Sequence, residues 1–173
     1  MAPPLADQAD LLAAAREGDH EAGHLLMREH GPAMVRTAWA VLGRYGGNEA
    51  DDVVQEAFIA ALTTPSLPSG NVGAWLRAIT ARKALDAARA AKRRGEEGLI
   101  DVPHHDASAN DVLAVREGLA RLAPADRAVL VLVDLEGRSM TEAASALGIT
   151  NVAARLRAVR ARRKLAKILE RVR

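Results

Sequence analysis

The side chains of this 173-residue chain that could do chemistry are charged groups in helical spacing, and such groups bind charged partners. Asp52, Gln55, Glu56 and Ile59 follow the i, i+3, i+4, i+7 pattern that places residues on one face of a helix. The apolar residues of the same segment form a second stripe, which predicts a helix with a core face and an acidic face. Such an acidic face either docks on a basic protein surface or is simply hydrated.

Cationic residues follow in a helix predicted from Val72 to about Arg94. Arg82, Asp86, Arg89 and Arg93 share one stripe of it, and Asp86 lies four residues from Arg82 and three from Arg89. Asp86 is therefore expected to form ion pairs within the helix that hold the arginines in place. The surplus cations remain available for a polyanion.

A third pattern, near the C-terminus, predicts a helix-turn-helix. Ser139 and Glu142 form a capping box that opens a short helix, Gly148 supplies the left-handed backbone of a turn, and Thr150 caps a last helix. The cations of that last helix are Arg155, Arg157, Arg160, Arg162, Arg163, Lys164 and Lys167. A cationic second helix fits the major groove of DNA, whereas a plain helical hairpin with a hydrated arginine face is the alternative.

Enzyme chemistry has little support in the sequence. The chain contains no cysteine, which excludes disulfides, thiolate metal sites and cysteine nucleophiles. It contains no phosphate-binding loop of the GxxxxGK[ST] type, and the adjacent His104, His105 and Asp106 have poor geometry for a metal. We therefore expect no catalytic residue, no metal site and no cofactor.

The elements that position these charges are helices. The chain is 49% hydrophobic but only 2% aromatic, and its abundant alanine favours helix over strand. We predict an all-α protein. The helices are expected over residues 11–16, from Asp19 to an end at Gly46 and Gly47, over 49–62 after an Asn48 cap, over 72–94 after an Asn71 cap, around 112–122, from Pro124 to before Gly137, over 139–147, and from about Asn151 to the C-terminus.

Residues 95–110 break the helical periodicity and hold glycine, proline, aspartate and serine but no basic residue. They predict a flexible acidic linker between two small helical domains, residues 1–94 and 111–173. The net charge is −6 over 1–62, +6 over 63–94, −5 over 95–114 and +7 over 115–173. These alternating blocks favour a chain that meets a basic protein surface with one part and a polyanion with two others.

The location expected from the sequence is the cytoplasm. The uncharged apolar runs, such as Val129–Val133, are far shorter than the roughly 18 residues that a membrane span needs. The N-terminal segment MAPPLADQAD has neither the basic nor the apolar region of a signal peptide.

Three segments together resemble one family. They are EADDVVQEAFIAAL, AWLRAITARKALDAARAAKRR and GLARLAPADRAVLVLVDLEGRSMTEAASALGI, and in this order and spacing they are similar to bacterial RNA polymerase sigma factors of the extracytoplasmic-function (ECF) group. The resemblance covers nearly the whole chain. It implies sigma region 2 over 1–94 and sigma region 4 over 111–173. It also implies a transcription initiation factor that binds core RNA polymerase, directs it to a promoter class and helps to open the DNA, with an anti-sigma factor as an expected partner.

The resemblance assigns roles to three groups of residues. The polymerase-binding candidates are Asp51, Asp52, Gln55, Glu56 and Ile59. The candidates for binding the minus-ten promoter element are Asn71, Trp75, Arg77, Arg82, Lys83, Arg89, Lys92 and Arg93. The candidates for reading the minus-thirty-five element, within a helix-turn-helix from about Met140 to Val159, are Thr150, Asn151, Arg155, Arg157 and Arg160.

Two departures from the family pattern leave alternatives open. Trp75 is the one aromatic in the melting region, so base stacking is weaker or is supplied by the loop backbone. In the last helix the core line of the family falls on Ala154, Ala158, Ala161 and Leu165. Val152, Leu156 and Val159 then lean toward DNA. Either the helix is rotated to bury them, or they meet thymine methyls or a protein partner.

Two other functions are alternatives to transcription initiation. A sigma-like protein that sequesters an anti-sigma or other regulator, without initiating transcription, fits the reduced aromatics and the unusual last helix. A repressor that uses only the helix-turn-helix leaves the acidic face of residues 51–56 unexplained.

Overall fold

The computed structural model describes residues 5–45, 49–65, 67–68, 70–96 and 109–170, and these residues form helices joined by turns. The helices are α1 (Leu5–Arg16), α2 (His20–Leu42), α3 (Glu49–Thr63), α4 (Val72–Arg94), α5 (Ala109–Ala120), α6 (Pro124–Leu130), α7 (Met140–Leu147) and α8 (Asn151–Glu170). A short 3-10 turn, η1 (Gly43–Tyr45), follows α2, and a π-helical turn, η2 (Val131–Leu135), continues α6. The described residues contain no strand, so the all-α prediction is confirmed. Most of the predicted linker, 97–108, lies outside the described residues.

The helix starts follow the caps that the sequence predicts. The Asp19 carboxylate accepts from the Ala22 N–H at 3.1 Å, and the Asn71 side chain accepts from the Ala74 N–H at 2.7 Å. Both bonds of the capping box between Ser139 and Glu142 are present. Each cap satisfies an N–H that has no partner within its own helix.

The end of α2 differs from the prediction. The helix ends at Leu42, and Gly43 takes a left-handed φ of 58° as its C-cap while its N–H bonds the Trp39 carbonyl. The predicted end at Gly46 and Gly47 is therefore wrong. The reason is tertiary, because a Cβ at Gly43 would lie 2.6 Å from the guanidinium of Arg127, so the chain turns at the residue that can approach this side chain. The predicted Asn48 cap lies outside the described residues.

Helices α1–α4, the N-terminal half, pack through small side chains. Ala57 and Ala61 of α3 and Ala81 and Ala84 of α4 are fully buried. Larger aliphatic side chains such as Met34 and Leu76 fill the space between the helices. Close helix contact through alanine thus replaces the aromatic core that the composition lacks.

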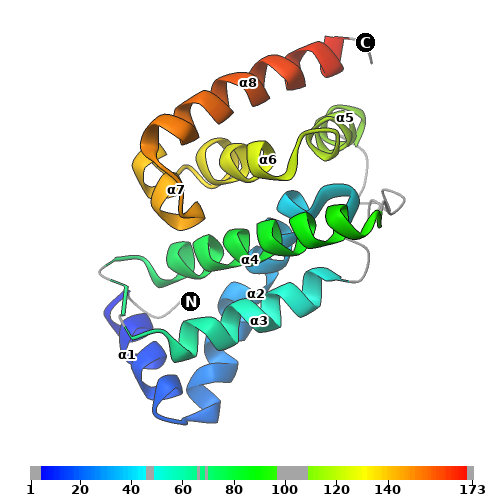
Figure 1. The fold of residues 1–173 in the computed structure, drawn as a ribbon. Helices are drawn as coiled ribbons and strands as arrows, with labels where there is room; N and C mark the ends of the chain where they lie inside the picture. The colour runs from blue at the N-terminus through cyan, green and yellow to red at the C-terminus, as the bar shows by residue number, and fades with distance from the viewer. Residues whose placement is uncertain (1–4, 46–48, 66, 69, 97–108, 171–173) are drawn as a thin grey trace.

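Helices α5–α8, the C-terminal half, pack against α4 and against the C-terminal end of α2 (Figure 1). Ala154, Ala158 and Ala161 of α8 are buried against the other helices of the C-terminal half, as the family core line predicts. The helix is therefore not rotated to bury the alternative face. Val152, Leu156 and Val159 remain 68%, 61% and 44% exposed.

Candidate nucleic-acid and partner interface

The acidic face of α3 points into solvent. Its backbone is fixed by Val53, Val54 and Ala57, which are buried on the opposite side of the helix. The five predicted polymerase-binding residues, Asp51, Asp52, Gln55, Glu56 and Ile59, are all exposed. Glu56 lies 3.9 Å from the Lys83 ammonium of α4, a weak exposed pair. The structure thus brings the whole group together on one accessible helix face.

The beginning of α4 is engaged in the fold. The exposed Asn71 uses its side chain to cap the helix, and Trp75 is half-buried. Arg77 forms an ion pair with Glu136, which belongs to the turn before α7. Arg77 therefore joins the two halves in this arrangement.

The exposed cationic stripe of α4 faces the C-terminal half. A Cβ at Gly148, the turn residue of the helix-turn-helix, would lie 3.2 Å from Arg82 Nη1, so the Arg82 guanidinium lies against this turn. Farther along, Arg89 pairs with Asp86 at 3.7 Å, which is one of the two ion pairs predicted for Asp86. Arg89, Lys92 and Arg93 also line a pocket between α4, α6 and α8.

The helix-turn-helix has the predicted local geometry. Gly148 adopts the left-handed φ of 64° that ends α7, and the Thr150 hydroxyl accepts from the Ala153 N–H at 3.1 Å to cap α8. Asn151 donates from Nδ2 to the Thr141 hydroxyl at 2.7 Å, which ties α8 to α7. Thr150 and Asn151 are two of the five residues predicted to read the minus-thirty-five element, and their side chains already hold the turn together.

The arginines of α8 differ in their surroundings. Arg157 Nη1 lies 3.1 Å from Asp126 of α6, and Arg160 lies 3.5 Å from the same carboxylate oxygen. Arg162 pairs with Asp134 through two hydrogen bonds of 3.1 and 2.7 Å, and these bonds raise the pKa of Arg162. Arg155 is exposed. Arg155 is therefore the arginine among these that is best placed to reach a new partner without first leaving an acid.

Glu136 connects the two halves through contacts that the sequence did not predict. Its carboxylate accepts from the Thr37 hydroxyl of α2 at 2.6 Å and from Arg77 of α4. The Glu136 side chain is 16% exposed, so this charge is mostly withdrawn from water and satisfied by two N-terminal-half donors.

Arg127 also connects the two halves, through hydrogen bonds that the sequence did not predict. It is completely buried and donates from Nε to the Val41 carbonyl at 2.6 Å and from Nη2 to the Leu42 carbonyl at 2.8 Å. Nη1 faces three carbonyls at the end of α5 and just beyond it, at 3.3 to 3.4 Å. Burial lowers the pKa of Arg127 to about 10, which still leaves the side chain protonated at neutral pH. One guanidinium fork thus satisfies helix-end carbonyls from both halves.

The signal for Arg127 was present in the sequence but ambiguous. Arg127 stands just before the apolar run Ala128–Val133, which predicts a buried segment. This position shows neither that Arg127 itself is buried nor which carbonyls accept from it.

Metal binding and membrane insertion gain no support from the described residues. Those residues contain no group of three or more histidine or acidic side chains that could hold a metal ion. The sequence candidates His104, His105 and Asp106 lie outside the described residues. None of the described helices combines the length and the apolar character that crossing a bilayer requires.

The fold and these surfaces define a helical protein with an exposed acidic helix face and a helix-turn-helix. Residues 26–94 match the family model of sigma-70 region 2, and residues 113–165 match that of sigma-70 region 4. The chain is 34% identical over 166 residues to the ECF RNA polymerase sigma factor SigM of Mycobacterium tuberculosis, covering 93% of this chain and 84% of that protein. It is 34% identical over 191 residues to the RNA polymerase sigma factor CnrH of Cupriavidus metallidurans, covering 98% and 97% of the two chains.

A solved structure agrees with these matches. The structure of CnrH in complex with the cytosolic domain of CnrY superposes with a TM-score of 0.64 at 31% identity, and the match covers 94% of this chain and 97% of that one. The chain therefore belongs to the ECF RNA polymerase sigma factors.

Proposed function

We propose that this sigma factor binds core RNA polymerase through the acidic face of α3 and directs it to a class of promoters. The observation that carries the proposal is the combination of an exposed acidic face on α3 with a capped helix-turn-helix whose second helix is cationic. The first feature fits a basic protein surface, and the second fits the major groove of DNA.

In this proposal residues 1–94 act as sigma region 2 and residues 111–173 as sigma region 4. The cations of α4 bind phosphates near the minus-ten element, and α8 reads the minus-thirty-five element. The protein has no catalytic centre of its own and works in the cytoplasm, where it acts on the polymerase that it recruits.

An anti-sigma factor is part of the proposal. The relative CnrH is described in complex with the cytosolic domain of CnrY. By this likeness, the exposed surfaces of the present chain are suited to a protein that competes with the polymerase.

Run-off transcription tests the proposal. Purified chain is added to core polymerase on a pool of genomic promoters, and wild type is compared with Asp52→Arg plus Glu56→Arg. The matched control is Asp10→Arg plus Glu17→Arg, two exposed acids on and just after α1 with the same change in charge. Defined transcripts are expected from wild type and from the control, and a loss of at least a hundredfold from the α3 variant.

Two results would replace the proposal. Tight binding of a regulator by a wild type that gives no transcripts would favour a sequestering protein. Equal loss in both double variants would show that the effect is one of net charge and not of the α3 face.

A further inference from the structure

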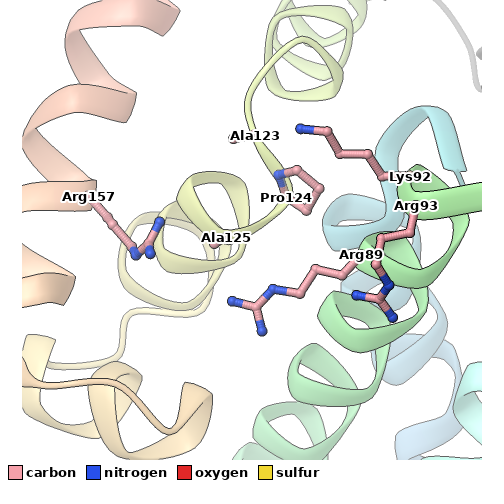
Figure 2. A pocket seen from close by; sticks show the side chains of 7 residues that line it. All are labelled: Arg89, Lys92, Arg93, Ala123, Pro124, Ala125 and Arg157. Carbon is pink, nitrogen blue, oxygen red and sulfur yellow. The ribbon is translucent and has the colours of Figure 1, made fainter. Parts of the chain in front are cut away.

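A pocket of about 480 Å³ lies between the two halves of the molecule. Figure 2 shows its labelled side chains: Arg89 and Lys92 extend from α4, and Arg157 reaches toward α6 from α8. The lining residues are Arg89, Lys92, Arg93, Ala123, Pro124, Ala125 and Arg157.

The charge of the pocket has one sign. All of its charged lining residues are cations, and the other three are apolar. Two of these cations pair with acids that are not part of the lining: Asp86 is 3.7 Å from Arg89, and Asp126 is 3.1 Å from Arg157. Four cations that share two neighbouring carboxylates leave a surplus of positive charge, which favours an anionic ligand.

Arg157 carries an unsatisfied donor at this place. Its Nη1 bonds Asp126, but its Nε is buried and has no hydrogen-bond partner. A buried donor without a partner costs free energy. Because Nε has almost no accessible surface, a ligand oxygen would recover this hydrogen bond only after the Arg157 side chain turns toward the pocket. This is an observation independent of the net charge.

We propose that the pocket binds a small ligand with several phosphate groups. Arginine forks pair with phosphate oxygens in a bidentate manner, and three of the four cations are arginines. The volume falls in the range of small-molecule sites, roughly 300 to 1,000 Å³. The apolar wall from Ala123 to Ala125 offers a surface for an uncharged part such as a nucleoside.

The ligand would link the halves, since Arg89, Lys92 and Arg93 belong to α4 and Arg157 belongs to α8. It would stabilise the arrangement in which the halves are packed together. It would also occupy cations that are assigned to promoter DNA, and this regulatory consequence rests on the proposed function. The binding itself does not.

Isothermal titration calorimetry on the full chain tests the binding, with tripolyphosphate and GTP as probes at about 150 mM salt, where surface charges are screened beyond roughly 8 Å. Saturable one-to-one binding is expected. Arg89→Gln plus Arg157→Gln should weaken it at least tenfold, and Lys92→Gln alone about threefold. The matched control, Arg163→Gln plus Lys167→Gln, removes two exposed cations of α8 away from the pocket and should stay within twofold.

The two probes distinguish the sources of the phosphates. Tighter binding of GTP than of tripolyphosphate would assign the apolar wall to a nucleoside, and equal affinity would assign the site to the phosphate chain alone. Either probe should also raise the melting temperature of wild type but not of the Arg89 and Arg157 double variant. Circular dichroism confirms that each variant is folded.

Three results would overturn the proposal: no saturation with either probe, equal weakening in the pocket variant and in the control, or tighter binding of a glutamate-rich peptide than of both phosphates. The last would assign the pocket to an acidic protein segment. Because the titration contains neither polymerase nor DNA, its failure is separable from a failure of the sigma-factor function.

Discussion

The acidic face of α3 and the cations of α4 and α8 are both candidates for binding a partner, but they differ in how far the fold already engages them. The α3 residues are exposed and meet no part of the C-terminal half in the described contacts, whereas Arg77, Arg82 and Arg157 lie in or beside the contact between the halves. Polymerase docking through α3 therefore requires no rearrangement of this chain. Binding of DNA by Arg77, Arg82 and Arg157 would require the halves to separate, whereas Arg155 of α8 is already exposed.

The largest expected effect comes from Arg127→Leu, which breaks the contact between the halves at its most buried point. The substitution leaves the Val41 and Leu42 carbonyls without their charged donor, together with the carbonyls at the end of α5. We expect a loss of about 3 kcal/mol in the free energy of unfolding. For a chain of this size that lowers the melting temperature by about 6 to 12 °C in calorimetry.

Arg127→Lys is the informative companion. It keeps the charge but not the fork that reaches several carbonyls, so an intermediate melting temperature is expected. A melting temperature within 2 °C of wild type for Arg127→Leu would contradict the importance assigned to this contact.

Glu136→Ala should have the next largest effect, because it releases Thr37 and Arg77 while leaving the core intact. Weakening the contact by about 1 kcal/mol makes the separated halves more populated, and affinity for minus-thirty-five duplex DNA should rise about fivefold. Fluorescence anisotropy measures this affinity. Glu117→Ala on α5 is the control for charge, and an equal rise in that variant would remove the explanation.

Leu156→Ala tests whether the exposed apolar face of α8 contacts DNA. Because Leu156 is 61% exposed, the melting temperature should hardly change, but affinity for minus-thirty-five DNA should fall about threefold if the side chain packs on thymine methyls. Val112→Ala, at another exposed apolar position of the C-terminal half, is the control. Unchanged DNA affinity would leave the Val152, Leu156 and Val159 face to a protein partner.

The smallest effect concerns His30, which is buried where α2 meets the start of α4. Burial lowers the pKa of His30 below its ordinary value of 6.5, and nearby Arg77 adds to this against an opposing effect of Glu29. The unfolded chain then binds a proton more readily than the folded chain, so stability is complete above about pH 6.5 and falls as the pH drops below it.

Denaturant unfolding between pH 7.5 and 5 measures this change. His30→Gln should flatten the pH dependence, whereas His24→Gln, at an exposed position of α2, should not. An unchanged slope in His30→Gln would show that other groups cause the acid sensitivity.

The sequence predicted the local features of the fold because each depends on a few neighbouring residues. The caps at Asp19, Asn71 and Thr150 form within one turn of helix, and the left-handed Gly148 follows from the turn itself. The exposed face of α3 follows from helical periodicity in the same way. The roles of these surfaces in binding polymerase and DNA stay predictions.

The contacts between distant segments were not predictable from one sequence. Arg127 and the Val41 carbonyl are 86 residues apart, and Arg77 and Glu136 are 59 residues apart. Nothing in the local pattern around either partner identifies the other. The early end of α2 at Gly43 has the same origin, since it reflects the approach of Arg127. The register of α8 also required the structure, which buries its alanines and leaves its larger side chains exposed.

The most direct test measures the separation of the halves during initiation. The chain has no cysteine, so cysteines introduced at the exposed positions His24 of α2 and Lys167 of α8 can carry a fluorescence donor and acceptor without side reactions. Our account predicts that energy transfer falls clearly when core polymerase and promoter DNA are added to the free protein. Unchanged transfer in a sample that produces run-off transcripts would contradict it.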